Sequence, residues 1–396
     1  MLKQIKKALF LFSTIVFLTG CEKDQDAVLE ENLMFEDQSE NYIPLTKAEL
    51  ISNNILFENP ETKQPVKKNV QSVTPIMDQN KDNLYYIINY EKGGFAILAA
   101  DNRSIPILAY SETQSFSIDE NLKEKEGVSD WMEFAKKQID EIRKDNLSAS
   151  KEIKEAWKSY ENSRKINYTY TKNSKKEDPI GGCDPETEEV SPLIDTNWSQ
   201  GCGYNDLLPL KSCTTNACGR VYAGCVPVAI AQVMKYHEFP NNYNWSNMPD
   251  NFGSIETSTL IRDIHNNINN SDLTYSCDGT GVDSDYGVAG LFKSNFGYSY
   301  ASQKETNFYQ EIAKMNLRKG QPVILAGSNS SSGHMWVCDG FRRSETCVGG
   351  GMLVSILKLH MNWGWGGNHN GWYSWNNFNP NSTYNSDNVI YYNIKP

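Results

Sequence analysis

Residues 223–240, AGCVPVAIAQVMKYHEFP, predict a buried helix that begins at a cysteine and ends near a histidine. Pro227 fits only the first turn of a helix, where its missing N–H costs no hydrogen bond, and Pro240 lies just beyond the expected end. The stretch between them is apolar on nearly every side, apart from Gln232. Cys225 is therefore expected at the N-terminus of a helix that is held rigidly inside the protein.

This position is compatible with two roles for Cys225. Unpaired N–H groups and the helix dipole favour an anion at a helix N-terminus, so a thiolate is stabilised there, and so is an oxyanion formed beside it. Gly224 lets a substrate approach closely. Cysteine is also among the most frequently buried residues, and a thiol that only packs in the core fits the same stretch. The helix alone leaves both roles open.

His237 is excluded as a base for Cys225. The two residues are 12 positions apart, and at about 1.5 Å rise per residue this places them about 18 Å apart along the helix. Proton transfer needs a hydrogen-bond distance of about 3 Å. His237 is expected to provide a polar end to the helix, and the base must come from another segment.

A better-placed histidine occurs in PVILAGSNSSSGHMWVCDGF, residues 322–341, where His334 opens a strand after a Ser/Gly loop. Further on, MLVSILKLHMNWGWGG predicts a second strand that carries Asn362. If the two strands form an antiparallel hairpin centred on Val348, Asn362 lies opposite His334, where its amide would hold the imidazole in the required tautomer. A shift of one residue would turn Asn362 away. The minor candidates for the base are His360 and His369.

The first 20 residues predict an export signal. A basic start precedes an apolar run, residues 8–18, that is too short to span a bilayer. LTGC, residues 18–21, then resembles the lipobox of bacterial lipoproteins, in which the cysteine is acylated and becomes the new N-terminus. We therefore expect Cys21 to anchor the protein to the outer membrane or cell surface, with a chance cysteine as the alternative. No other stretch approaches the 18 consecutive apolar residues of a transmembrane helix.

The charge and the cysteine content narrow down the class of protein further. The formal net charge is −11, and residues 191–396 hold 13 Lys and Arg against 15 Asp and Glu, so the chain lacks the basic footprint of a nucleic-acid-binding protein. Nine cysteines are natural after export, where disulfides persist. A local disulfide between Cys213 and Cys218 is plausible, although pairings cannot be deduced from sequence. Paired Cys-x-x-Cys motifs are missing, so no metal or other cofactor is expected.

The chain divides into two parts. Residues 83–116 predict a small antiparallel sheet. Two helical patterns follow: residues 128–142 carry one apolar face, and residues 151–165 are mostly charged and are expected to face solvent. Residues 161–192 lose periodicity and indicate an exposed linker. A second domain of about 200 residues follows. It starts with a mainly helical half and ends with strand-like runs at 322–327, 334–341, 352–363 and 388–394.

Four motifs together resemble the streptopain family of secreted bacterial cysteine peptidases. They are the helix from residue 224, GHMWVCDGF (333–341), HMNWGWGGNHNGWY (360–373) and NWSQGCGYND (197–206). The stretch from residue 85 to residue 116 is also similar to the family's propeptide. The resemblance implies an α+β fold: a papain-like catalytic domain of one helical half and one antiparallel β half, preceded by a small α+β propeptide domain.

The resemblance also implies domain limits and a zymogen. The signal peptide would cover residues 1–20, the inhibitory propeptide with its linker residues 21–178, and the catalytic domain residues 179–396. Cleavage, commonly by the enzyme itself, is expected in the linker near Lys172, Lys175 and Lys176. The implied partners are protein or peptide substrates, the chain's own propeptide as inhibitor, and a membrane through the lipid anchor.

The site residues follow from the same motifs. Cys225 would attack the peptide carbonyl, and His334 would take and return the proton. Gln200 would donate to the oxyanion, Asn362 would orient the histidine, and Trp363 would shield the pair. Two other classes remain open: a non-catalytic surface binding lipoprotein, to which the 11% aromatic content would contribute, and a Cys-His amidase or acyltransferase acting on cell-wall peptides.

Overall fold

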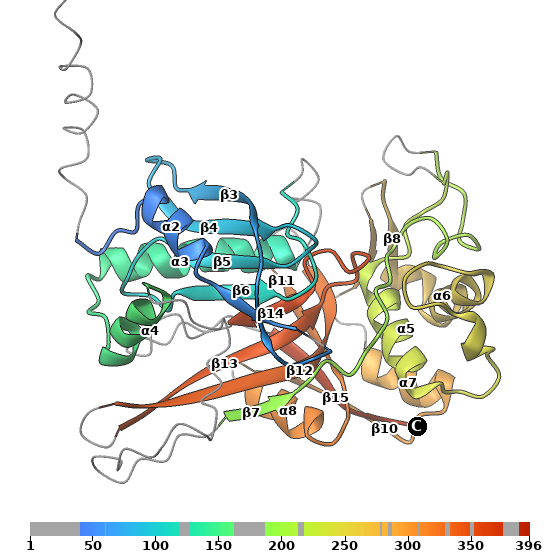
Figure 1. Ribbon diagram of the computed structural model, residues 1–396. Helices are drawn as coiled ribbons and strands as arrows, with labels where there is room; N and C mark the ends of the chain where they lie inside the picture. Colours follow the sequence, from blue (N-terminus) through green and yellow to red (C-terminus); the bar gives the residue numbers. More distant parts are fainter. Residues whose placement is uncertain are drawn as a thin grey trace, which may run out of the picture. The chain divides into compact units, whose positions relative to one another are not determined.

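The computed structural model describes residues 40–59, 61–118, 127–161, 187–212, 218–277, 279–283, 287–306, 309–328, 333–348, 352–374 and 388–396. The predicted export signal, Cys21 and the linker lysines lie outside these ranges. Residues Asn41–Pro396 form one compact unit, and the elements below all belong to it (Figure 1).

The N-terminal part is built on four neighbouring antiparallel strands. Its elements are α2 (Leu45–Ser52), β1 (Leu56–Glu58), β2 (Pro65–Lys67), β3 (Val70–Met77), β4 (Asn83–Tyr90), β5 (Phe95–Ala99), β6 (Ile107–Ser111), α3 (Val128–Lys144) and α4 (Lys151–Glu161). Strands β3 to β6 pair in sequence order. The tight turn before β5 requires Gly93, because a Cβ there would lie 2.1 Å from the carbonyl oxygen of Thr113. The antiparallel sheet predicted for residues 83–116 is confirmed.

The two helices of this part differ from each other in how well the sequence predicts them. Helix α3 buries the expected apolar face, including Trp131 and Ile139. The expectation that the second helix faces solvent is wrong, because α4 buries Ile153, Trp157 and Tyr160. These residues follow one another at intervals of four and three and form a narrow apolar stripe between charged flanks.

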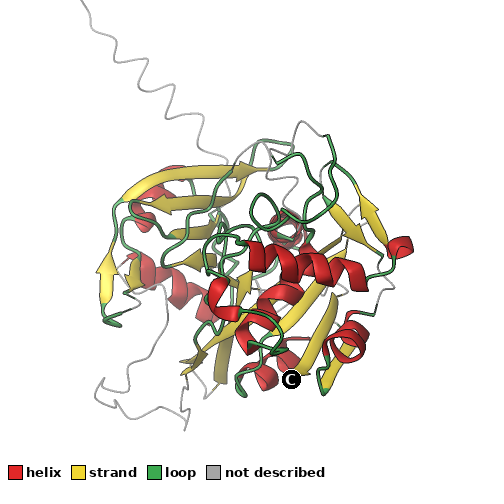
Figure 2. Cartoon of the chain, turned by 90° about the vertical axis from the view of Figure 1, so that its right-hand side faces the viewer, coloured by secondary structure: helices red, strands yellow, loops and turns green. Residues whose placement is uncertain are grey.

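The C-terminal part has a helical half and a β half. The helical half contains α5 (Cys225–His237), η2 (Trp245–Asn247), α6 (Ile255–Asn267), η3 (Asn270–Asp272), β8 (Leu273–Tyr275), β9 (Thr280–Val282) and α7 (Val288–Phe296). The β half contains β7 (Thr187–Val190), β10 (Tyr300–Glu305), α8 (Tyr309–Leu317), β11 (Val323–Ser328), β12 (Gly333–Val348), β13 (Met352–Asn362), β14 (Gly371–Ser374) and β15 (Asn388–Lys395). Figure 2 views the helical side, with helices in front of strands.

One antiparallel sheet of 11 described strands runs through both parts of the chain. Its order is β10-β15-β11-β12-β13-β14-β6-β5-β4-β3, and β7 pairs with β12. The two parts join where β14 pairs with β6, with Trp372 opposite Tyr110 and Tyr373 opposite Ala109. The N-terminal strands therefore extend the sheet of the β half, an arrangement that the sequence did not predict (Figure 1).

Two hydrophobic cores lie on opposite faces of β12. Trp336 and Cys338 belong to the first core, which also contains residues of β4, β5, β6 and α3. Met335 and Val337, the alternate residues of the strand, pack in the second core with α5, α6 and α7. The N-terminal part and the β half thus share one core, so their contact is an apolar interior rather than a wet surface.

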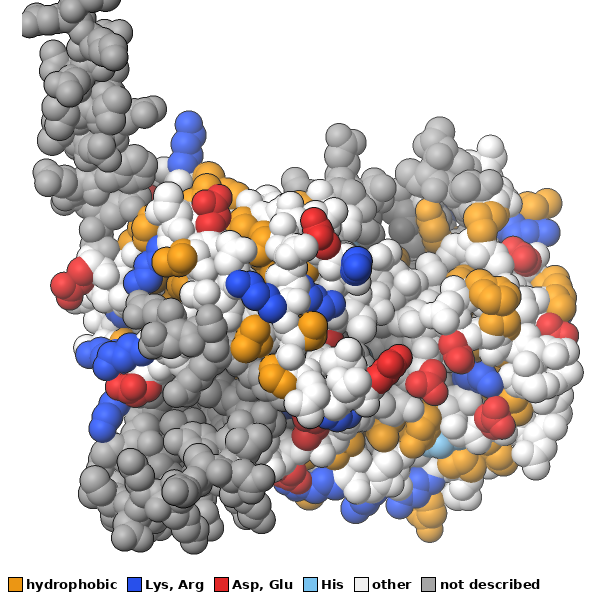
Figure 3. All heavy atoms as spheres, in the orientation of Figure 1, with side chains coloured by type: hydrophobic (Ala, Val, Ile, Leu, Met, Phe, Trp, Pro, Cys, Tyr) orange, Lys and Arg blue, Asp and Glu red, His pale blue; other side chains and the backbone are white. Residues whose placement is uncertain are grey.

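The surface has a mixed charge. On the face shown in Figure 3, Lys and Arg side chains are interspersed with Asp and Glu. Among the described residues, none of the helices has both the length and the apolar character needed to cross a membrane.

Candidate active site

Cys225 occupies the first position of helix α5. Gly224 is the N-cap, with φ 84° and ψ 152°, and the helix runs to His237 as predicted. A Cβ at residue 224 would lie 2.6 Å from the carbonyl oxygen of Thr280, so glycine is required there for space as well as for its positive φ. The Cys225 thiol is half-buried beside the second core. Its backbone N–H is one of the helix's first donors, which lack partners within the helix.

The loop in front of Cys225 is fixed by hydrogen bonds from three other segments. The N–H of Ala223 donates to the carbonyl oxygen of Gln200 over 2.8 Å. The Nε2–H of His265, on α6, donates to the carbonyl oxygen of Ala223 over 2.7 Å. The Thr280 hydroxyl donates to the carbonyl oxygen of Tyr222 over 2.6 Å. Sequence reasoning missed His265, because no motif surrounds it.

Gln200 lies next to this loop and carries an amide donor that is not in use. Its side chain is 5% exposed, and its Nε2 is buried without a hydrogen-bond partner among the described residues. A buried donor without a partner costs about 1–3 kcal/mol. The backbone bond to Ala223 places Gln200 near the start of α5, which keeps this amide a candidate donor to an oxyanion at Cys225.

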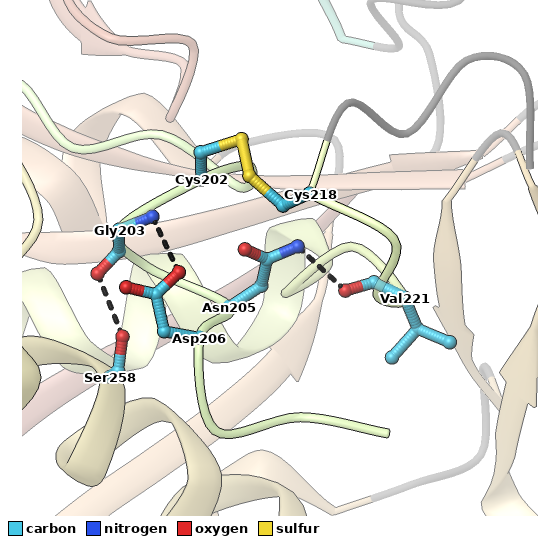
Figure 4. The surroundings of a disulfide bond; sticks show 7 residues. All are labelled: Cys202, Gly203, Asn205, Asp206, Cys218, Val221 and Ser258. Carbon is cyan, nitrogen blue, oxygen red and sulfur yellow. Dashed lines mark hydrogen bonds between the residues drawn. A yellow bond between two sulfur atoms is a disulfide. The ribbon is translucent and has the colours of Figure 1, made fainter. Parts of the chain in front are cut away.

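A disulfide braces the same region. Cys202 is bonded to Cys218, so the predicted pairing of Cys218 with Cys213 is wrong. Figure 4 shows the adjacent hydrogen bonds, in which the amide of Asn205 donates to the Val221 carbonyl over 3.0 Å. The loop after Gln200 is thereby tied to the segment before Cys225. Cys277 is also disulfide-bonded, whereas Cys225 and Cys338 carry thiols.

His334 is enclosed by aromatic rings at the start of β12. Its ring stacks with Trp365 at 5.5 Å between centroids and with Trp336 at 6.0 Å. Its Nε2–H donates to the carbonyl oxygen of Trp363 over 3.0 Å, and Nδ1 is buried without a hydrogen-bond partner among the described residues. Burial lowers the pKa of His334 to about 4, although the hydrogen bond to Trp363 opposes this shift. The imidazole is therefore neutral at pH 7.

Gly127 of the N-terminal part lies directly against this imidazole. A Cβ at residue 127 would lie 2.2 Å from Cδ2 of His334, closer than any side chain permits. Gly127 has φ 83° and is the N-cap of α3, where its N–H donates to the Asp130 carboxylate over 3.3 Å. The start of α3 therefore covers the histidine so closely that only a glycine fits at this position.

Asn362 does not lie opposite His334. It pairs with Val337, and its amide donates to the carbonyl oxygen of Thr196 over 2.7 Å while its Oδ1 accepts from the N–H of Gly364. The predicted register is wrong for two reasons: Val348 pairs with Met352, so the turn centre lies two residues further on, and a bulge separates Cys338 from Gly340.

Trp363 lies in the first core, close to His334. Its ring centroid is 6.5 Å from that of His334 and 5.2 Å from that of Tyr373. After it come Gly364, Gly366 and Gly367, which all have positive φ. The N–H of Gly366 donates to the Trp198 carbonyl over 2.9 Å, so this loop contacts the segment that carries Gln200.

His237, which was excluded as the base, and the two minor candidates His360 and His369 are all engaged elsewhere. His237 is hydrogen-bonded to the hydroxyl of Tyr298 at 3.3 Å, and burial lowers its pKa to about 4. His360 is hydrogen-bonded through Nδ1 to the Asp339 carboxylate at 2.6 Å. His369 donates from Nε2 to a carbonyl of the N-terminal part over 2.8 Å. Among the described residues no cluster of His, Cys, Asp and Glu is suited to a metal ion.

A thiol at a helix N-terminus, a buried amide donor beside it and a histidine covered by an N-terminal domain are the parts of a cysteine peptidase in precursor form. Residues 198–373 match the Peptidase C10 family, and residues 40–139 match the Spi protease inhibitor family. The C-terminal part is therefore a cysteine peptidase domain of the Peptidase C10 family, and the N-terminal part is a propeptide inhibitor domain.

Individual relatives agree with this assignment. Streptopain of Streptococcus pyogenes is 28% identical in an alignment 352 residues long, and the match covers 75% of this chain and 75% of streptopain. The thiol protease/hemagglutinin PrtT of Porphyromonas gingivalis is 24% identical over 375 residues, covering 80% of this chain but 38% of PrtT. A prointerpain A fragment of Prevotella intermedia superposes with a TM-score of 0.56 at 21% identity, over 82% of this chain and 99% of the fragment. The predicted α+β fold with a propeptide domain is confirmed.

Proposed function

We propose that this chain is the precursor of an exported, lipid-anchored cysteine endopeptidase that hydrolyses peptide bonds of extracellular proteins. Residues 1–20 are the signal peptide, residues 21–178 the propeptide with its linker, and residues 179–396 the catalytic domain. The contact of Gly127 with His334 carries the proposal, because it joins the inhibitor domain directly to the expected base.

Cys225 and His334 act as nucleophile and base in the proposed mechanism. His334 takes the thiol proton, and the thiolate attacks the peptide carbonyl to form a tetrahedral oxyanion. The oxyanion accepts hydrogen bonds from the Gln200 amide and the backbone N–H of Cys225. His334 then gives its proton to the leaving amine, and a thioester remains. Finally His334 takes a proton from water, the hydroxide attacks the thioester, and the acid product leaves as the thiol forms again.

The precursor is latent because His334 is neutral and its Nε2–H is hydrogen-bonded to the Trp363 carbonyl instead of interacting with Cys225. A neutral imidazole whose Nε2–H is held by the Trp363 carbonyl gives a thiolate no compensating charge. Departure of the propeptide removes Gly127 and opens the ring to water, so its pKa rises toward the ordinary value of about 6.5. Trp363, which carries the ring's acceptor, then shields the ring, and Asn362, the residue before it, helps to orient the ring by fixing this segment through Thr196 and Gly364.

The anchor is proposed on the sequence of residues 18–21 alone. Acylated Cys21 would hold the precursor at the outer membrane or cell surface, and cleavage in the linker would release the mature enzyme. Labelling with an alkyne fatty acid tests this step: the precursor should take up label, and a Cys21→Ala precursor should not.

The peptidase itself is tested on the purified precursor. The wild-type chain should shorten by roughly the front domain and then degrade casein, whereas Cys225→Ser should stay full length and inactive. Cys338→Ser is the matched control, because this second thiol is buried in the first core. Normal maturation and casein cleavage by Cys225→Ser would reject the assignment. Activity on isolated cell-wall peptides without activity on casein would favour an amidase instead.

A further inference from the structure

Strand β14 has one edge that belongs to the catalytic part and one that the propeptide covers. On one side it pairs with β13, and on the other with β6 of the propeptide. Figure 1 shows β6 directly beside β14. Under the proposed function the propeptide leaves, and the N–H and C=O groups of this second edge lose their partners. The inference below rests on that step and concerns the mature enzyme.

An arginine lies beside this edge and forms hydrogen bonds with two side chains of the propeptide. The Arg342 guanidinium lies 4.0 Å from the ring centroid of Trp372. It donates to the hydroxyl of Tyr110 over 2.8 Å and to the carboxylate of Glu112. The indole N–H of Trp372 also donates to Glu112, over 3.1 Å. Arg342 and Glu112 are each only 13% exposed, so the pair is largely shielded from solvent.

Two contacts within the catalytic part also hold Arg342. Glu189, on β7, accepts a hydrogen bond from its Nη2 over 3.1 Å and forms an ion pair with its Nε at 3.1 Å, and the Trp372 ring supports its flat face. Departure of the propeptide therefore removes one carboxylate and one phenol from an arginine that stays in place. Tyr110 lies on β6 and Glu112 comes one residue after its end, and both side chains reach the same guanidinium.

The contact continues beyond a bend at residues 112–113. The N–H of His369 lies 3.5 Å from the carbonyl oxygen of Ser115, and its Nε2–H donates to that of Ser117 over 2.8 Å. Phe116 packs edge-on against the His369 ring at 4.5 Å. Main-chain groups thus bind along the β14 edge and the loop before it, while Arg342 and Trp372 contact side chains.

We propose that this surface is a substrate-binding exosite of the mature enzyme. It binds an extended segment of a protein substrate that carries an aromatic residue and, two positions later, a glutamate or aspartate. The segment adds as a strand to β14, the aromatic residue covers Trp372, and the carboxylate replaces Glu112 on Arg342. Residues 107–117 occupy the exosite in the precursor, so the propeptide blocks substrate capture as well as the histidine.

Peptide binding to the matured enzyme tests the exosite. The precursor is allowed to mature, Cys225 is alkylated with iodoacetamide, and fluorescence anisotropy measures the affinity of labelled peptides. One peptide has the sequence of residues 105–117, IPILAYSETQSFS, and a second carries Glu112→Gln. A further pair has an unrelated alternating sequence with a Tyr-x-Glu or a Tyr-x-Gln motif. In both pairs the peptide with glutamate should bind about tenfold more tightly than the peptide with glutamine. A neutral glutamine amide cannot form the ion pair that a carboxylate forms with the shielded Arg342 guanidinium.

Enzyme variants assign the effect to Arg342. Arg342→Gln should remove the preference for glutamate, and Arg342→Lys should keep part of it, since lysine retains the charge but not the two-pronged donor. Lys304→Gln, on the distant edge strand β10, is the control and should leave the preference intact. Equal affinities within each pair, or a preference that survives Arg342→Gln, would overturn the exosite. A preference confined to the propeptide sequence would overturn its role in substrate capture.

The exosite and the proposed function fail in different ways. Failure of the proposed function appears before any peptide is added, as a precursor that neither matures nor cleaves casein. Failure of the exosite appears in an enzyme that matures and cleaves casein normally but does not distinguish glutamate from glutamine.

Discussion

Substitution of Gly127 by alanine should loosen the closed precursor. The new Cβ would lie 2.2 Å from Cδ2 of His334, whose ring is confined by Trp336 and Trp365. The atom it meets is part of a buried ring and not the free end of a flexible chain. Either α3 must move away from β12 or the imidazole must leave its position.

The free-energy cost of Gly127→Ala to the closed precursor has two contributions. Holding an L-residue at the positive φ of Gly127 costs about 1 kcal/mol, and inserting a methyl group into a packed interior costs about 1–3 kcal/mol. Together they destabilise the closed arrangement by about 2–4 kcal/mol. Because every 1.4 kcal/mol is a factor of ten, the open fraction should rise by about 30- to 1000-fold.

Thiol alkylation of the intact precursor measures the open fraction. Cys225 should react with iodoacetamide faster in Gly127→Ala than in the wild type, and the mature form should appear sooner. Gly297→Ala is the control, because residue 297 also has a positive φ, of 71°, but nothing lies within 4 Å of its added Cβ. Equal alkylation and maturation rates in Gly127→Ala and wild type would refute the role of this contact, and so would an equal acceleration by Gly297→Ala.

Three further predictions concern the site. The folded-state pKa of His334, about 4, lies below the unfolded value of about 6.5, so the unfolded chain binds more protons between these values. The precursor's melting temperature should therefore fall from pH 6.5 to pH 4, and less steeply in His334→Gln; an unchanged slope would contradict the burial argument. Gln200→Ala should lower kcat by about 10²- to 10³-fold with little change in KM, measured on a short peptide; an unchanged kcat would remove Gln200 from the oxyanion site. Cys202→Ser should lower the free energy of unfolding in urea by about 3 kcal/mol, and adding Cys218→Ser should cost little more; fully additive losses would argue against the bond.

Local patterns in the sequence predicted individual elements well. Pro227 lies in the first turn of α5 and Pro240 lies three residues beyond its end, as predicted. Apolar periodicity likewise predicted the buried face of α3. In these segments the signal comes from neighbours within a few residues, where helix geometry alone decides which side chains face the core.

Longer-range features escaped prediction for physical reasons. The position of Asn362 depends on where a hairpin turns and on a bulge beside Gly340, and neither is encoded in strand alternation. Cys218 pairs with the more distant Cys202 because the fold, not chain proximity, brings the sulfur atoms together. The pairing of β6 with β14 joins residues more than 250 positions apart. The sequence of each strand alone is that of an ordinary buried strand and does not indicate its partner.

The join between β6 and β14 also determines how reversible maturation is. While the chain is intact, the two edges meet at the effective concentration of tethered segments, on the order of millimolar. Under the proposed function, one cut in the linker leaves the contacts of the joined sheet in place but makes the association of the two parts bimolecular, so dilution then favours separation. The freed propeptide carries β6, an apolar strand with an unpaired edge that is prone to aggregation or degradation. Activation therefore proceeds in one direction without any stored strain.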